Sequence, residues 1–245
     1  MLACLVVAQT SEARKIQGFE AGDPAFTKTG DAGNQGTYQG EAPPEGSVQF
    51  LISTINTGAN EDGATAQSGT SAVAFSTLNS FFFNTTVSNQ TGSGLLIPFT
   101  FLAGDTTLTF QYDFLSNEPN QTTPRNDFAF EALFDPASGT PLIGSVTHFA
   151  QVTGTSFSLF GAQTPFIFHT GYQTFTISLT GLGLVAGTTY DLGLGVADAT
   201  NSDHASGLLV DNVQVIGVPE PSTVGLGIAG AVLMVALRSR IKRKS

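Results

Sequence analysis

The sequence predicts an all-β protein, an antiparallel β-sandwich of jelly-roll type, followed by one C-terminal transmembrane helix. Only 11% of the 245 residues are charged, less than half of the usual share of about a quarter, and the helix-forming residues Lys, Arg and Glu are scarce. Apolar residues alternate with Ser and Thr at a period of two over much of the chain, which is typical of strands covered on one face. Gly-rich segments separate these runs and predict the turns between strands.

Residues 1–13 are predicted to be the remnant of a secretory signal peptide. Residues 1–8 (MLACLVVA) are apolar, and Ser11 and Ala13 place small residues at positions −3 and −1 of a cleavage site after Ala13. A signal peptide also has a basic n-region and a longer apolar core. Because residues 1–13 have neither, we expect the natural start to lie upstream. Cys4 leaves lipid attachment as a less favoured alternative, since the apolar run continues past it.

Residues 14–217 are predicted to form the sandwich. The cleanest strand signal is the segment 108–114, in which four large apolar residues alternate with Thr109, Gln111 and Asp113. Further alternating segments are 48–53, 128–134, 174–180, 190–196 and 209–216. In each segment the Phe-rich or aliphatic face should line a core between two sheets, and the other face should meet solvent. No 3.6-residue period is visible before residue 222, so no helix is expected in the body.

The charges are divided unevenly between the body and the C-terminal tail. The chain has nine basic and 19 acidic residues, a net charge of −10. Five of the nine basic residues lie in the last eight positions, so residues 14–217 hold four basic and 17 acidic residues, a net charge of −13. Such a body should repel nucleic acid, which binds cationic surfaces, and should attract divalent cations.

The sequence contains no motif typical of a catalytic centre. A single Cys excludes a disulfide framework and a multi-Cys metal site. There is no GxSxG or HExxH motif, and the three His residues are far apart in the chain. His169 follows the apolar residues 166–168 and is interpreted as an ordinary strand residue. We therefore expect no enzyme; the least favoured alternative is a polysaccharide hydrolase, whose two facing carboxylates no motif would mark.

The segment 218–245 combines three features in order. Val218, Pro219, Glu220 and Pro221 precede an uncharged run of apolar and small residues, 222–237. As a helix this run would be about 24 Å long, slightly less than the roughly 30 Å of a bilayer core, and flanking basic side chains can reach the interface. A basic cluster follows: Arg238, Arg240, Lys242, Arg243 and Lys244. Such a tail predicts a cytoplasmic C-terminus, with the rest of the chain outside.

This order of motif, apolar helix and basic tail resembles a PEP-CTERM protein-sorting signal. The resemblance implies a bacterial protein that is exported, held briefly in the inner membrane by its C-terminal helix, and processed near Pro219-Glu220-Pro221 by an exosortase. It also implies delivery to the cell surface or to an exopolysaccharide matrix, since the family is associated with biofilm production. The expected partners are therefore an exosortase, the inner membrane and an exopolysaccharide.

Loop carboxylates make calcium the expected ion, because Ca²⁺ takes several oxygen ligands of the kind that loops supply. Glu20, in the segment 18–23, and Asp211, in the last predicted strand, resemble the pair that joins the first and last strands of calcium-stapled jelly-roll carbohydrate-binding modules. The resemblance implies one structural Ca²⁺ between Glu20 and Asp211. The alternative is that both are ordinary surface carboxylates.

A second expected ion site lies between two predicted strands. Residues 114–118 (FLSNE) and 126–130 (NDFAF) resemble the choice-of-anchor extracellular domains, which occur together with PEP-CTERM signals. Glu118 and Asp127, at the ends of the connecting loop, could chelate Ca²⁺. Equally, Arg125 could neutralise Glu118 in a surface ion pair worth under about 1 kcal/mol. The acidic segment 198–203 lacks the Gly and the distal Glu of an EF-hand loop and is interpreted as a polar turn.

We therefore predict an exported cell-envelope or matrix protein whose body is a non-enzymatic structural or adhesive module. The alternative is a calcium-dependent, lectin-like carbohydrate-binding module that holds glycan on a concave sheet face.

Overall fold

The computed structural model describes residues 12–55, 72–74, 91–118, 127–135, 137, 142, 147–160, 165–198 and 204–218. The sorting motif from Pro219 onward, the apolar run 222–237 and the basic tail lie outside these residues, as does Arg125. Among the residues that are described, no helix is long and apolar enough to cross a membrane. The transmembrane helix at 222–237 therefore stays a prediction.

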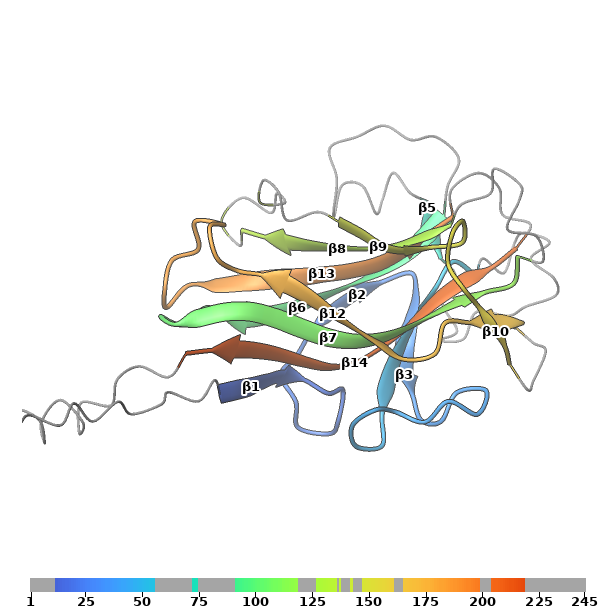
Figure 1. Cartoon of the computed structure of the whole chain (residues 1–245), viewed down its shortest axis with the longest axis horizontal. Coiled ribbons are helices and arrows are strands. Elements are labelled where there is room, and N and C mark those ends of the chain that lie inside the picture. The colour runs from blue at the N-terminus through green and yellow to red at the C-terminus, as the bar shows by residue number, and fades with distance from the viewer. Residues whose placement is uncertain are drawn as a thin grey trace, which may run out of the picture.

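The strands pair antiparallel and form two sheets, which lie face to face as two layers (Figure 1). The eight-stranded sheet has the order β10 (Ser158–Leu159), β11 (Phe168–His169), β7 (Asp105–Ser116), β14 (Ser206–Gly217), β4 (Gln49–Ser53) and β3 (Asp31–Gln35), with β1 (Glu12–Gln17) on β14 and β12 (Gln173–Ser178) on β7. The six-stranded sheet has the order β2 (Thr27–Thr29), β6 (Thr91–Thr100), β13 (Thr189–Ala197), β8 (Phe128–Phe134) and β9 (Thr147–Gln151), with β5 (Val73–Ala74) on β6. The predicted all-β, antiparallel sandwich is confirmed, while its assignment to the jelly-roll type stays a prediction.

The first and last strands lie side by side (Figure 1). β1 pairs with β14 from Glu12 opposite Gly217 to Gln17 opposite Val213. The chain therefore enters and leaves the sandwich at the same end. The cleavage predicted after Ala13 would remove the first two residues of β1.

The main core lies between the sheets and follows the predicted pattern on β7. The four large apolar residues of segment 108–114 are all buried in it, as predicted. Phe110 packs edge-on against Phe149 of the facing sheet, with ring centroids 5.3 Å apart, and lies 5.5 Å from Phe175. Such aromatic pairs contribute about 0.5–1.5 kcal/mol each beyond the area they bury. β13 adds three aliphatic residues to the same core: Leu192, Leu194 and Val196.

The prediction of one solvent-facing side is wrong for β4. All five residues of this strand are buried. Phe50 and Ile52 belong to the main core, whereas Leu51 faces the opposite way and belongs to a second apolar cluster with Tyr38 and Phe166. Tyr38 lies in the turn after β3, and Phe166 lies just before β11. These two segments cover the outer face of the eight-stranded sheet, which local alternation cannot foresee.

The Phe-rich face of β8 also lies away from the main core, contrary to the prediction. Ala129 and Leu133 face the main core, whereas Phe130 and Phe134 pack in a third cluster on the other face of the six-stranded sheet. Gly195 of β13 pairs with Phe130, and a Cβ at Gly195 would overlap the Phe130 ring. Glycine on the neighbouring strand thus provides the space that Phe130 fills.

Candidate functional site

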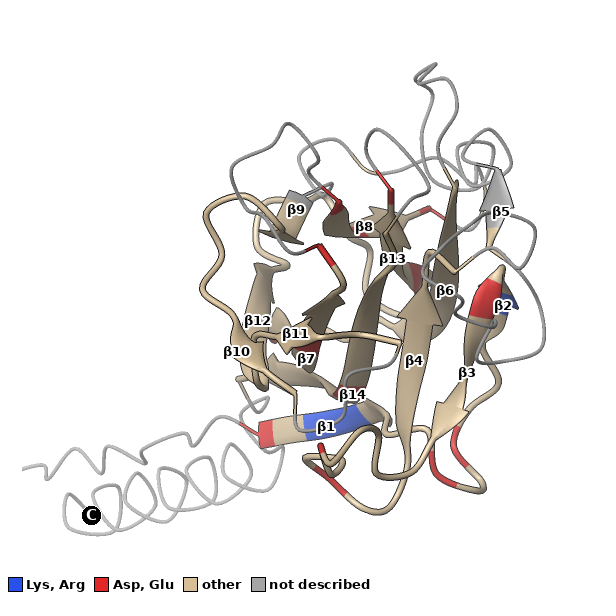
Figure 2. Ribbon diagram, turned by 90° about the vertical axis from the view of Figure 1, so that its right-hand side faces the viewer, with Lys and Arg blue, Asp and Glu red and all other residues tan. Residues whose placement is uncertain are grey.

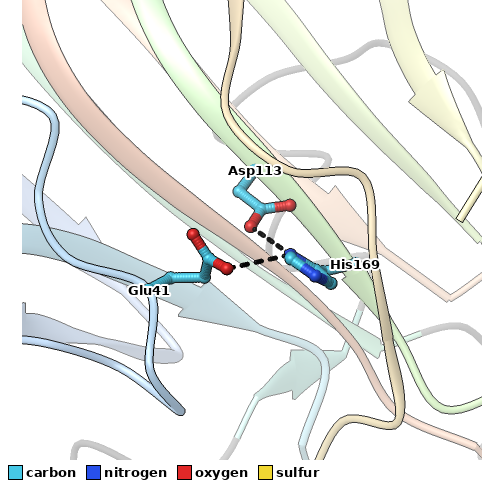
Figure 3. Close-up of side chains that lie close together, drawn as sticks. All are labelled: Glu41, Asp113 and His169. Atoms are coloured by element: carbon cyan, nitrogen blue, oxygen red, sulfur yellow. Dashed lines mark hydrogen bonds and ion pairs between the residues drawn. The ribbon is translucent and has the colours of Figure 1, made fainter. Parts of the chain in front are cut away.

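Within the described part of the chain, the fold brings together three side chains that could hold a metal ion: Glu41, Asp113 and His169 (Figure 3). One nitrogen or oxygen atom from each of them lies within 4.8 Å of the corresponding atoms of the other two. They come from the turn after β3, from β7 and from β11, which are distant in the sequence. The group lies on the outer face of the eight-stranded sheet, opposite the main core.

The alternation of β7 directs Asp113 to this face. Tyr112 and Phe114 are buried in the main core, so Asp113 between them points the other way. Asp113 is nevertheless fully buried, and its Oδ1 accepts hydrogen bonds from the backbone N–H and the hydroxyl of Thr170, each at 3.0 Å. Burial raises the pKa of Asp113, while the hydrogen bond and the charge of His169 oppose this rise.

β11 places His169 beside Asp113, because it pairs with β7 and sets His169 opposite Leu115. His169 Nδ1 lies 3.0 Å from Asp113 Oδ2 and 3.6 Å from Glu41 Oε1. The imidazole ring stacks on Phe160, with centroids 4.1 Å apart and an angle of 15° between the planes. The ring is therefore held with Nδ1 toward both carboxylates (Figure 3).

A tight turn positions Glu41. Tyr38 and Glu41 exchange two backbone hydrogen bonds, at 2.9 and 2.8 Å. Gln49 of β4 donates from Nε2 to the carbonyl of Glu41 at 3.0 Å and accepts a hydrogen bond from the Tyr172 hydroxyl. The Glu41 side chain is 32% exposed and that of His169 12%, so the group reaches solvent mainly through Glu41.

The arrangement supports two kinds of chemistry. One imidazole nitrogen and two carboxylate oxygens are a donor set for a divalent cation, and they also offer acceptors and a donor to the hydroxyl groups of a ligand. A His–Asp pair with Nδ1 toward the carboxylate would, in addition, orient Nε2 as a base. His169 Nε2, however, makes no hydrogen bond to another described residue, so the pair activates no nucleophile among them.

The predicted calcium pair, Glu20 and Asp211, meets at one loop, residues 45–48. Glu20 Oε1 accepts two backbone N–H groups of this loop, and Asp211 Oδ2 accepts a third at 2.8 Å. The hydrogen bonds lower the pKa of Glu20, whereas burial raises the pKa of Asp211 to about 6. Asp211 is buried, so it is not the surface carboxylate of the alternative interpretation. Both carboxylates anchor the loop through backbone amides, and a shared Ca²⁺ stays a prediction.

Glu118 and Asp127 lie at the ends of β7 and β8 and are buried, with 5% and 1% of their surface exposed. Arg125 lies outside the described residues, so its pairing with Glu118 stays a prediction. Asp198, expected in a polar turn, is also buried; it follows Ala197, which pairs with Phe128, the residue after Asp127. Chelation of Ca²⁺ by Glu118 and Asp127 stays a prediction.

His169 lies in a strand, as predicted, but its ring also meets two carboxylates that the sequence analysis did not connect with it. Neither Glu41 nor Asp113 is marked by a motif. One signal was available in the sequence. Asp113 interrupts the outward face of the longest alternating segment, whose other outward residues are the neutral Thr109 and Gln111. If that face is covered, as it is here, an acidic residue on it needs a partner, because an unpaired buried charge is costly.

No protein-family model matches the chain, and no curated protein matches it significantly. Among solved structures, it is similar to the K2 cleaved adhesin domain of Lys-gingipain, with a TM-score of 0.38 and 13% identity over 84% of this chain and 97% of that chain. It is also similar to TmCBM61, solved with beta-1,4-galactotriose (TM-score 0.41, 10% identity, 84% and 99% covered), and to a cyclase from Fischerella sp. TAU (0.32, 14%, 84% and 97%). Similarity at this level does not bear on ligand or activity, which must be argued from the residues.

Proposed function

We propose that the protein is an exported, non-enzymatic adhesive module that binds a polysaccharide on the outer face of its eight-stranded sheet, around Glu41, Asp113 and His169. The observation that carries the proposal is the convergence of these three side chains at one partly exposed place on that face. Carboxylates accept hydrogen bonds from sugar hydroxyls, and an imidazole can donate or accept. Two of the groups are on paired strands and the third is on a hydrogen-bonded turn, which fixes their spacing, as selective binding of a hydroxyl pattern requires.

The charge of the body narrows the class of ligand. With a net charge of −13, residues 14–217 should repel a polyanion. The described basic residues are on β1 and β2, whereas the group is built on β7, β11 and the turn after β3 (Figure 2). We therefore expect a neutral polysaccharide, bound by hydrogen bonds, in preference to an acidic one.

The test is a binding panel of neutral and acidic polysaccharides, using the full chain in mild detergent. We expect at least one neutral polysaccharide to bind, and Glu41→Gln to weaken that binding at least about fivefold, or roughly 1 kcal/mol, because one acceptor is lost. Glu45→Gln is the matched control, since the Glu45 side chain is 40% exposed, similar to that of Glu41 at 32%, but pairs with Lys15 at 3.5 Å. Absence of binding to every polysaccharide would rule out the proposal, and release of reducing sugar would contradict its non-enzymatic part.

The sorting of the protein is a second part of the proposal. The chain is exported, residues 218–245 hold it in the inner membrane until an exosortase processes it, and it is then delivered to the cell surface or matrix. The place where the chain leaves the sandwich supports it. Val218 donates its backbone N–H to the carbonyl of Gly104, in the turn after β6. Three apolar side chains are exposed at this end of the fold: Leu102 (43%), Val185 (62%) and Val218 (48%). An apolar end that comes shortly before the run 222–237 in the sequence is suited to lie at a membrane surface.

Replacing Pro219-Glu220-Pro221 by three alanines tests the sorting in a host that carries an exosortase. The variant should stay uncleaved and cell-associated, whereas the parent chain should appear in a shorter form outside the inner membrane. If the parent chain is not shortened when the exosortase is present, this part of the proposal is contradicted. Polysaccharide binding would be unaffected by that result.

A further inference from the structure

We propose that Glu41, Asp113 and His169 hold a divalent transition-metal ion, for which Zn²⁺ is the probe, through Glu41 Oε1, Asp113 Oδ2 and His169 Nδ1. This metal site goes beyond the proposed polysaccharide binding and does not depend on it. It also differs in place and in ligand type from the calcium pairs that the sequence predicts.

The distances from His169 Nδ1 to the two carboxylates suit one shared ion, and the two carboxylate oxygens lie within 4.8 Å of each other. Zn²⁺ binds nitrogen and carboxylate oxygen at about 2.0–2.2 Å, so two ligand atoms on one ion lie roughly 3.0–3.5 Å apart. Nδ1 lies 3.0 Å from Asp113 Oδ2 and 3.6 Å from Glu41 Oε1. The described residues give the Glu41 carboxylate no other partner than His169, so it can make the small movement that closes the set.

The charge of the group also calls for a cation. Two carboxylates lie within 4.8 Å of one imidazole nitrogen and of each other, and a protonated imidazole would supply one positive charge at most. The basic side chains of the described residues are bound elsewhere: Arg14 to Asp105, Lys15 near Asp23 and Glu45, and Lys28 to the carbonyl of Ala32. A divalent ion would neutralise both carboxylates at once.

The surroundings hold two of the three ligands in place. Thr170 donates two hydrogen bonds to Asp113 Oδ1, the oxygen that does not face His169. Phe160 stacks on the imidazole and fixes its plane. Hydrogen bonds that hold a ligating carboxylate in place strengthen metal sites, and their loss typically costs tenfold or more in affinity.

The donor set selects against calcium. Ca²⁺ takes six to eight oxygen ligands, whereas an imidazole nitrogen suits zinc and other first-row metals. The partly exposed side of the group, at Glu41, would leave open positions on the ion for water or for an oxygen of a ligand.

The test is calorimetric titration of the EDTA-treated, dialysed full chain with ZnCl₂ near neutral pH, with CaCl₂ titrated in parallel and no polysaccharide present. We expect one Zn²⁺ per chain, an increase in melting temperature with Zn²⁺, and no comparable increase with Ca²⁺. Glu41→Gln should weaken Zn²⁺ binding at least about tenfold. This variant should fold, because among the described residues the Glu41 side chain forms an ion pair only with His169, while its backbone bonds remain.

Two controls make the result specific. His169→Gln should also weaken binding, whereas His148→Gln, at an exposed histidine that stacks on Phe128, should not. Glu45→Gln should leave the affinity unchanged. No Zn²⁺ binding by the parent chain, or equal affinity in the parent, Glu41→Gln and His169→Gln chains, would overturn the site and show that the group is an ion pair only. Because no polysaccharide is present, this failure would leave the polysaccharide assay to be judged by itself.

Discussion

The eight-stranded sheet carries two pairs of carboxylates that are held in different ways. Glu20 and Asp211 accept backbone N–H groups of the 45–48 loop, whereas Glu41 and Asp113 converge on the imidazole of His169. A backbone amide cannot lose its proton and cannot be displaced without moving the loop. An imidazole can change its protonation or bind a cation through the same nitrogen. The first pair is therefore a structural anchor, and the second is a site that can exchange its partner.

The largest expected effect on stability comes from removing Asp113, the buried carboxylate of the pair that meets His169. Asp113→Ala should lower the free energy of unfolding by about 3–5 kcal/mol, because it breaks the buried pair with His169 and removes an acceptor of two hydrogen bonds from Thr170. Urea denaturation followed by circular dichroism measures it. Asp113→Asn keeps an acceptor for Thr170 and should lose less. A parent-like midpoint for the alanine variant would show that the group is not a stabilising contact.

The anchor pair, Glu20 and Asp211, should make the stability of the fold depend on pH, and Asp211 should contribute most of this dependence. Its pKa is 3.8 in an ordinary environment and about 6 in the folded protein, so between these values the folded state holds a proton that the unfolded state has released. The contribution of Asp211 to stability therefore falls as pH rises from about 4 to about 6 and is constant above that.

Asp211→Asn removes this contribution while keeping an acceptor for the loop. The melting temperature of the parent minus that of the variant should decrease between pH 4 and pH 6. A difference that is flat over this window would contradict the raised pKa. Glu20, whose pKa is lowered, should behave with the opposite sign: its contribution is present above its ordinary value of 4.5 and is lost as pH falls below it.

The smallest effects are expected from substitutions of two glutamates near the 45–48 loop, Glu20 and Glu45. Glu20→Gln should speed the hydrogen exchange of the Ser47 and Val48 amides, which lose a charged acceptor, with little change elsewhere. Glu45→Gln, in a surface pair with Lys15, should change the free energy of unfolding by no more than about 0.5 kcal/mol. Unchanged exchange at Ser47 and Val48 would show that Glu20 does not hold the loop.

The fold could be predicted where one strand face is apolar and the other is not. Segment 108–114 has this pattern, and its apolar residues all line the main core. The prediction is wrong where both faces are apolar. On β8 the large Phe130 lies away from the main core because Gly195 on the neighbouring strand leaves room for it there. The sequence of β8 does not contain that information.

The candidate site could be predicted less well than the fold. Glu20 and Asp211 were singled out, and they do meet at one loop, although through backbone amides. His169 and Asp113 are 56 residues apart and are joined only because β11 pairs with β7. The local sequence of β11 does not indicate which strand it will pair with.

The sequence by itself therefore determined an antiparallel β-sandwich, the strands that line its main core, and a strongly acidic body. These follow from composition and from period-two alternation, which are local properties of the chain. Only the tertiary structure decided which face of β8 is the inner one, that the outer face of β4 is covered, and that Glu41, Asp113 and His169 share one place. These depend on strand order and register, which are set by contacts between segments far apart in the chain.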